Sequence, residues 1–423
     1  MLRALWADHV ELQVEIALGL PGDLIFTLDD PVQSQLDANM MLGSVDGQYD
    51  DVTCDVRSLT WRTGATRGDG ILTRWEAASC SIVLDNRDAQ YDPTQQPARL
   101  LPMIRVRIRA RRVPNDGTTP WLPMFMGYAD AWAMVWDEQH DATVVLTASG
   151  GTKLLSAYNA PELTSAVGGG ETAAQRATRI LNEAEWSDPR NITAGGTLRM
   201  STTMADDAWT QLLLNQDAEL GETYIDTDGT FVFIPRSLWI ANVSDPNATV
   251  VRWGPNDLRY ESAIVTNDDT NLRNIVDCAR PGGTAQTVRN DQSVAQYQPH
   301  RYGRMDLPFT NDGDAMDWAN LVMQTCSTPT QRIEQLEVLP QTSPDDLWDA
   351  ILNVSYAQHW QVTVDAPGMA SPLTHPVQVR GWEHVVDNES WRITYTLSEA
   401  TIWQGFRLDD PDPNATLDVM RLI

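Results

Sequence analysis

The stretch LPMIRVRIRARRV (residues 101–113), with WLPMFMGYADAWAMVW (121–136) and TVVLTASGG (143–151) after it, decides the fold. In the first segment apolar residues alternate with arginines, which is the two-residue period of a half-buried β-strand. PNDGTTP (114–120) and DEQHD (137–141) separate the segments and are rich in turn-forming residues. Strands joined by short turns predict an antiparallel barrel or sandwich.

Upstream segments extend this pattern. DVTCDVRSLTWRTG (51–64) and SCSIVLDNRD (79–88) predict two more strands, and ELQVEIALGL (11–20) alternates before a break at Pro21-Gly22. Residues 31–50 are polar and predict a loop. We therefore expect residues 1–150 to form a first β domain.

From residue 151 the apolar period becomes that of a helix. GGGETAAQRATRILNEAEW (168–186) and MADDAWTQLLLNQDAELGE (204–222) each place apolar residues on one helical face, and Gly221 is placed to end the second helix. Thr-Asp-Gly (227–229) then joins two short strands in a predicted hairpin. This pattern predicts a small α+β insertion domain over residues 151–255.

Strands return after this insertion, with two helices expected at 312–327 and 343–352. Ser343 as N-cap and Pro344 at the first helical position mark a strong helix start. The segment 377–400 predicts a closing hairpin with one buried and one wet face. The predicted fold is mainly β with α+β insertions: two β-barrel-like domains flank a small helix–hairpin domain. The second β domain covers 256–405, and 406–423 form a C-terminal tail.

Charge and composition limit the function. The net charge is −28, from 58 acidic and 30 basic residues, which disfavours general nucleic-acid binding. It suits solubility, repulsion between unassembled copies, or a surface along which nucleic acid slides without sticking. No stretch is apolar enough to span a bilayer, and early acidic residues interrupt any signal-peptide core. The sixteen tryptophans suit both β cores and protein interfaces.

We find no catalytic, metal or cofactor motif. The chain has no GxSxG, no metal-binding histidine pair and no Cys-His signature, and its cysteines are scattered like buried thiols of a protein folded in a reducing cytosol. Asp226, Asp228 and Gly229 lack the closing glutamate of a calcium loop and predict a tight turn. The glycines at 168–170 lack a following lysine and predict a flexible joint. The number of carboxylates leaves a catalytic pair of the glycosidase type as an open hypothesis, because four glutamates lie on or beside the predicted helices: Glu183, Glu185, Glu219 and Glu222.

One strand carries a candidate interface. Its apolar residues alternate with a ladder of four guanidinium groups, which would repel one another unless acidic groups neutralise them. The ladder consists of Arg105, Arg107, Arg109 and Arg111. Three hypotheses remain open: pairing with acids of the same sheet, such as those around Asp85 and Asp88; contact with a neighbouring subunit; or contact with DNA in a channel.

Several segments taken together resemble the baseplate or tail-tip hub (minor tail) proteins of long-tailed, siphovirus-type bacteriophages, especially those that infect actinobacteria. In LDNRDAQYDP (84–93) and the strands after it, the hub-type positions hold Asn86, Tyr91, Asp92, Pro93, Phe125, Gly127 and Asp130. Ser149 stands where an aspartate is more usual. The hairpin AELGETYIDTDGTFVFIPR (218–236) and RYGRMDL (301–307), with the closing hairpin, continue the resemblance over most of 51–400.

The resemblance implies two related β domains of the tail-tube type, assembled as a homotrimer in the virion after synthesis in the host cytoplasm. Such a trimer would join the hexameric tail tube to the tail tip and form part of the DNA exit channel. Its partners would be distal tail and tail-tube proteins, other tail-tip proteins, and passing viral DNA bound without sequence specificity. The alternative is a host-surface module whose exposed tryptophans stack on carbohydrate.

Overall fold

The computed structural model describes residues 9–18, 49–68, 70–92, 94, 99–113, 119–136, 141–159, 165–203, 206–238, 250–342 and 344–400. The predicted break at 21–22, nearly all of the loop at 31–50, most of the turns at 114–120 and 137–141, the cap at Ser343 and the tail at 406–423 lie outside these residues.

A first module of antiparallel strands contains the stretch that decides the fold. It comprises β3 (Val56–Gly64), β4 (Ser79–Asp85), β5 (Arg105–Arg112), β6 (Leu122–Trp136) and β7 (Ala142–Ser149), in the sheet order β3-β4-β7-β6-β5. The predicted alternation is confirmed in β5, where Val106, Ile108 and Ala110 are buried. β1 (Val10–Ile16) pairs with the outer edge of β5, and β2 (Asp50–Asp51) pairs with β1.

A second module repeats this topology. It comprises β14 (Ser262–Thr266), β18 (Arg332–Val338), β19 (His359–Val364), β20 (Leu373–Val386) and β21 (Trp391–Glu399). Its sheet order is β14-β18-β21-β20-β19, so strands that follow one another in the chain occupy the same places as in the first module. The mainly β fold predicted from the sequence is therefore confirmed.

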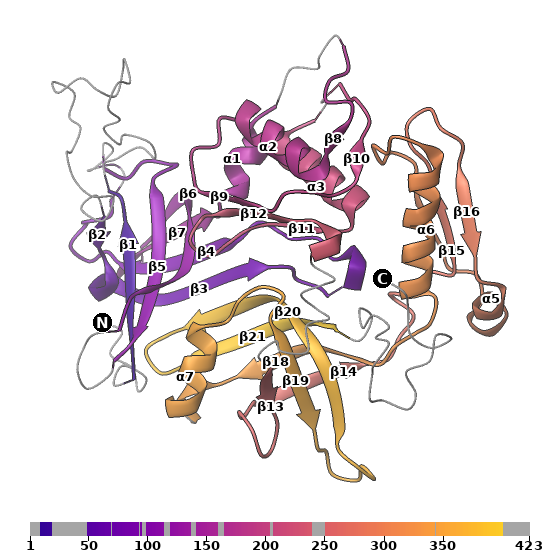
Figure 1. Ribbon diagram of the computed structural model, residues 1–423. Coiled ribbons are helices and arrows are strands. Elements are labelled where there is room, and N and C mark those ends of the chain that lie inside the picture. The colour runs from indigo at the N-terminus through magenta and orange to yellow at the C-terminus, as the bar shows by residue number, and fades with distance from the viewer. Residues whose placement is uncertain are drawn as a thin grey trace.

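The two modules share one sheet. β3 pairs with β20 in antiparallel register, and this seam joins all these strands, together with β13 (Val251–Trp253), into a 13-stranded sheet (Figure 1). Over the described residues the sheet is open and does not close into a barrel, because β14 at one end has a single neighbour. β13 pairs in parallel with β19. The predicted domain limits at 150 and 255 stay predictions, and β13 shows that the second module also uses residues before 256.

The insertion between the modules is a small α+β layer, seen above the sheet in Figure 1. Its helices are α1 (Thr152–Ala157), α2 (Ala173–Glu183) and α3 (Ala208–Glu219), and its strands are β8 (Glu171–Thr172), β9 (Arg190–Ile192), β10 (Leu198–Arg199), β11 (Glu222–Ile225) and β12 (Phe231–Ile234). Thr172 and Gln175 form a reciprocal capping box at the start of α2. The C-cap of α3 is Leu220, which adopts the left-handed conformation one residue before the predicted Gly221.

A second inserted unit lies between β14 and β18. It contains β15 (Ile275–Cys278), β16 (Gln286–Arg289), β17 (Arg301–Arg304), α5 (Asp291–Tyr297) and α6 (Asp312–Cys326). These strands form their own sheet in the order β16-β15-β17, and α6 packs on it around a separate core that includes Val276 and Trp318. The sequence predicted the helix but not this sheet. α7 (Pro344–Leu352) begins at the predicted proline.

The seam is filled by aromatic side chains and one buried ion pair. His384 of β20 stacks on Trp61 of β3 at 4.3 Å, and Trp391 packs edge-on against Trp61. Arg380, fully buried on β20, donates to Glu222 of β11 at 2.7 Å. The indole of Trp75 donates to the other oxygen of Glu222 at 2.5 Å. These contacts bind both modules and the insertion into one core.

Candidate assembly interface

The arginine ladder lies on the solvent-side face of β5, next to β1. Strand pairing sets Glu11 opposite Arg111 and Glu15 opposite Arg107. The side chains are half-buried, with 12% of Arg107 and 31% of Arg111 exposed. The ladder is therefore covered in part by the chain itself.

Glu15 neutralises the middle of the ladder. Its carboxylate accepts from Nε of Arg107 at 2.6 Å and lies 2.8 Å from Nε of Arg109. Only 5% of the Glu15 side chain is exposed, so this interaction is little weakened by water. Glu11 pairs with Arg111 at 2.7 Å in a more exposed position.

The acids that meet the ladder differ from the pair named from the sequence. Asp85 binds Arg57 and Arg87 instead. The reason is sheet order: β4 is separated from β5 by β7 and β6, whereas β1 is the neighbour of β5. Periodicity predicted that the ladder needs acids but could not identify the adjacent strand. Whether the ladder also contacts another subunit stays a prediction.

Arg105 connects the sheet to the insertion. Its guanidinium lies 2.6 Å from the carboxylate of Asp188, which also accepts from the Tyr128 hydroxyl at 2.8 Å. Asp188 follows α2 in the insertion. This end of the ladder therefore holds two parts of one chain together.

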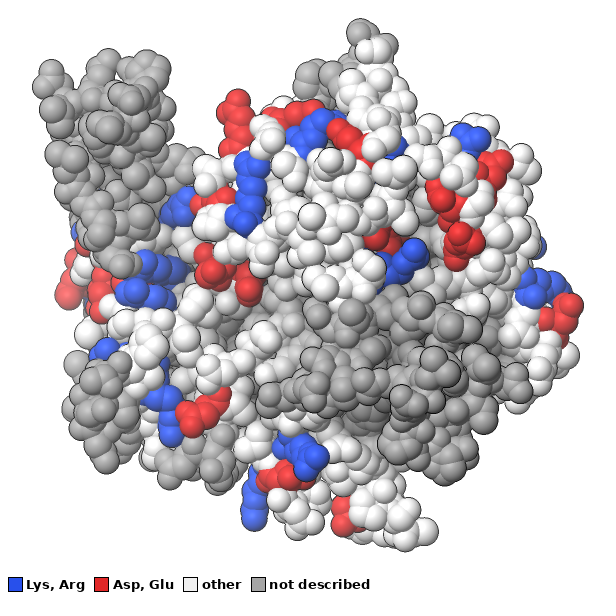
Figure 2. Space-filling model, viewed as in Figure 1, with Lys and Arg blue, Asp and Glu red and all other residues white. Residues whose placement is uncertain are grey.

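Aromatic rings cover the outer side of the ladder. Tyr49 lies over Arg107 at 3.9 Å and Trp121 over Arg111 at 4.5 Å. Burial raises the pKa of Tyr49, so its ring stays uncharged at neutral pH. Figure 2 shows one face of the molecule, on which basic and acidic side chains lie in small adjacent groups. This mixed surface does not attract DNA in the way that a basic patch would.

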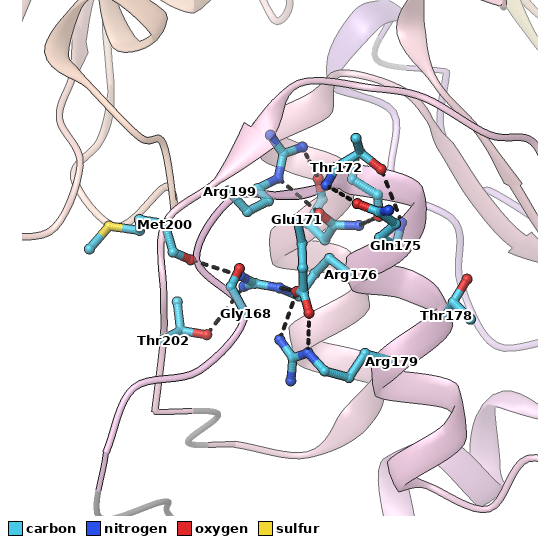
Figure 3. Close-up of polar contacts among 12 residues, drawn as sticks. Gly168, Glu171, Thr172, Gln175, Arg176, Thr178, Arg179, Arg199, Met200 and Thr202 are labelled. Carbon is cyan, nitrogen blue, oxygen red and sulfur yellow. Dashed lines mark hydrogen bonds and ion pairs between the residues drawn. The ribbon is translucent and has the colours of Figure 1, made fainter.

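A buried polar network fixes the loop before α2 (Figure 3). Arg176 donates to the carbonyls of Gly168 and Met200 at 2.9 and 2.7 Å, and to Glu171 at 2.7 Å. Gly168 has φ +76°, and an added Cβ there would overlap the carboxylate of Glu171. The glycines at 168–170 therefore form part of a fixed turn rather than the predicted flexible joint.

Arg199 is the second buried cation of this network. It donates to Asn215 at 2.9 Å and to Glu219 at 3.1 Å. Burial lowers the pKa of Arg199 to about 10, while Glu219 acts in the opposite direction, so the guanidinium remains charged at neutral pH. Sequence reasoning missed Arg176 and Arg199, because a lone arginine gives no pattern until its acidic partner is known.

Among the unpaired strand edges in the described part of the chain, two belong to the repeated modules and lie on β6 and β14. β5 reaches β6 only as far as Tyr128, so the edge of β6 over residues 131–136 has β7 on one side alone. β14 pairs only with β18. Val135 is 53% exposed and Ile264 is 49% exposed on these two strands.

The carboxylates that left a glycosidase pair open are engaged in structural contacts where they are buried. Glu219 accepts from Arg199, and Glu222 accepts from Arg380 and Trp75. Among the described residues no three His, Cys, Asp or Glu side chains lie close enough to hold a metal ion. Asp226 and Gly229 close the hairpin turn between β11 and β12, as predicted.

Neither the buried cysteines nor the helices of the described residues indicate a further functional site. Cys80 and Cys278 are buried, and burial raises the pKa of Cys278 to about 12, so it is not a thiolate at neutral pH. In the described residues no helix has the length and apolar character needed to cross a membrane.

Comparison of the fold with solved structures finds phage-type tail proteins. The chain is similar to the tail protein from Neisseria meningitidis MC58, with a TM-score of 0.56, 14% identity and coverage of 93% of this chain and 98% of that chain. It is also similar to the prophage MuSo2 43 kDa tail protein from Shewanella oneidensis, with a TM-score of 0.52, 13% identity and coverage of 85% and 97%. At these identities the likeness shows a shared fold. No protein-family model and no curated protein matches the sequence.

Proposed function

We propose that this chain is a structural tail protein of a phage-type particle, a trimeric hub between the hexameric tail tube and the tail tip. The observation that carries the proposal is the repeated module. Two modules of the same strand order stand side by side in one sheet within each chain. Three such chains present six similar units to a six-fold tube and three-fold symmetry to the tip.

The likeness in fold to two tail proteins over nearly their whole length supports this proposal. The proposal includes a siphovirus-type particle with an actinobacterial host, and a trimer at the tail tip that forms part of the DNA exit channel. The acidic composition fits a channel along which DNA passes without binding. The partners are tail-tube, distal tail and tip proteins.

The carbohydrate-binding alternative depends on exposed tryptophans. Most of the described tryptophans are buried, among them Trp61, Trp75 and Trp391, and Trp136 is the one large exposed indole in the described part of the chain. Trp136 is the last residue of β6, on the edge that has no strand partner in the described part of the chain. The structure therefore offers no specific observation that favours sugar binding over assembly.

The test is the mass of the purified chain in solution, measured by light scattering over a concentration series. A species of three times 47.1 kDa that images as a ring supports the hub. A closed ring of another number of copies, or a protein that binds host cell wall as a monomer, contradicts it.

A further inference from the structure

The repeated modules can be aligned residue by residue through a shared irregularity. The long strands β6 and β20 each have a β-bulge, between Ala129 and Ala131 in one and between Val379 and Gly381 in the other. Each bulge is followed by a tryptophan at the matching position, Trp132 or Trp382. β-Bulges are local features that fix register, so the two strands are equivalent along their length.

The halves of these strands beyond the bulge have different surroundings. In β20 the residues 381–386 pair with β3 and form the seam. In β6 the equivalent residues 131–136 have no strand on that edge in the described part of the chain. β14, the equivalent of β3, also lacks a neighbour on its outer edge there. The chain therefore has both halves of a second seam, but six other strands of its sheet separate them.

Neither edge has the features that keep exposed strands apart. Natural edge strands usually carry a lysine, a proline or an inward-facing charge. The segments AWAMVW (131–136) and SAIVT (262–266) have none of these, in a chain with a net charge of −28. Each instead exposes an aliphatic side chain, Val135 or Ile264. Both edges are thus uncharged, and one is equivalent to the β20 side of the seam and the other to its β3 side.

We propose that residues 131–136 of β6 pair with β14 of a second copy of this chain, as an antiparallel repeat of the seam between β3 and β20. The inference rests on the proposed hub function and identifies the surface through which its copies bind. The contact is head-to-tail, so it leaves one free edge of each kind until a ring closes.

The seam also gives the register of this contact. Within the seam Val385 lies opposite Thr60. Val135 is equivalent to Val385, because each is the same number of residues beyond its bulge. Ile264 is equivalent to Thr60, because their strands align through the neighbouring strands β18 and β4, which align in turn through β21 and β7. The two exposed aliphatic side chains are therefore cross-strand partners, with Trp136 opposite Ala263 and Met134 opposite Val265. The exposure of both side chains is independent of the bulges that define the equivalence of the strands, and it supports that equivalence.

Disulfide cross-linking of the full chain tests the contact. In a Cys54→Ser background, which removes an exposed thiol, we combine Val135→Cys with Ile264→Cys and oxidise mildly. Directly opposed residues of antiparallel strands lie about 4.5 to 5.5 Å apart between Cα atoms, within disulfide reach. Val385→Cys with Thr60→Cys is the positive control and links within one chain. Val113→Cys with Ile264→Cys is the matched negative control, since Val113 is 43% exposed but lies off both edges.

The expected result is a ladder of covalently joined chains for Val135→Cys with Ile264→Cys and at least ten times less for the negative control. Val135→Lys should also remove the oligomer while leaving the monomer folded, because the Val135 side chain is solvent-exposed in the isolated chain. An oligomer that forms without this cross-link overturns the inference and leaves the hub intact. A chain that stays monomeric without the cross-link overturns the inference, and imaging in the presence of tail-tube protein then judges the hub separately.

Discussion

His384 makes the stability of the seam depend on pH. Its ring is fully buried between Trp61 and Trp391, and its Nδ1 accepts from the Trp391 indole at 2.9 Å. Burial lowers the pKa of His384 to about 3, from an ordinary value of 6.5. The unfolded chain therefore binds more protons than the folded chain below pH 6.5. The stability contributed by the neutral ring is complete above pH 6.5 and is lost as the pH falls towards 3.

We expect the free energy of unfolding to be about 2 kcal/mol lower at pH 5 than at pH 7 because of this one group. Urea unfolding at both pH values measures it, and His384→Phe should remove this part of the dependence. His300 gives the comparison, because a hydrogen bond with Asp269 raises its pKa. Its contribution to the free energy of unfolding therefore changes with pH in the opposite direction. Its contribution is present below pH 6.5 and lost as the pH rises further. Equal pH dependence in the wild type and His384→Phe would contradict the prediction.

One buried carboxylate on β1 binds two arginines of β5. Glu15 serves both Arg107 and Arg109, whereas Glu11 serves Arg111 in a position where 48% of the Glu11 side chain is exposed. Removing one partner of a buried pair leaves an uncompensated charge, which costs about 3 kcal/mol or more. An exposed pair contributes about 0 to 1 kcal/mol.

We therefore expect Glu15→Gln to lower the free energy of unfolding by about 2 to 4 kcal/mol and Glu11→Gln by less than about 1 kcal/mol. The two substitutions are matched, since both neutralise one carboxylate on the same face of β1. Chemical denaturation at pH 7 compares them. Equal effects would mean that the ladder does not depend on burial of Glu15.

The elements differ in how far sequence could predict them. Local signals were sufficient for α7, which starts at Pro344, and for the β11–β12 hairpin with its Asp-Gly turn. The order of strands could not be predicted, because the pairing of β3 with β20 joins residues more than 300 positions apart. The sheet of β15, β16 and β17 was missed because each strand has only four residues, too few to establish a period.

The candidate site shows the same limit. Alternation in β5 predicted a row of arginines that needed acids, but only the fold identifies β1 and Asp188 as their source. The unpaired edges could not be predicted either, since 131–136 reads as an ordinary strand until the end of β5 is known.

At the scale of the whole molecule, two kinds of interface make opposite predictions about salt. Each copy carries a net charge of −28, so copies repel one another at low ionic strength. Salt screens this repulsion, since the Debye length falls from about 30 Å at 0.01 M to about 3 Å at 1 M. The edges of β6 and β14 are uncharged, and salt does not weaken their hydrogen bonds and apolar contacts in the same way.

We therefore expect the oligomer to form at lower protein concentration as sodium chloride rises from 0.02 to about 0.5 M, by at least about tenfold. Light scattering over a dilution series at each salt concentration measures the shift. An interface made by the arginine ladder would behave in the opposite way, because ion pairs across subunits weaken with screening. Arg111→Gln separates the two, since Arg111 is the most exposed arginine of the ladder. If assembly tightens with salt and survives this substitution, the edges hold the copies together and the ladder serves the single chain. If salt dissolves the oligomer and Arg111→Gln does the same, the ladder is the subunit interface.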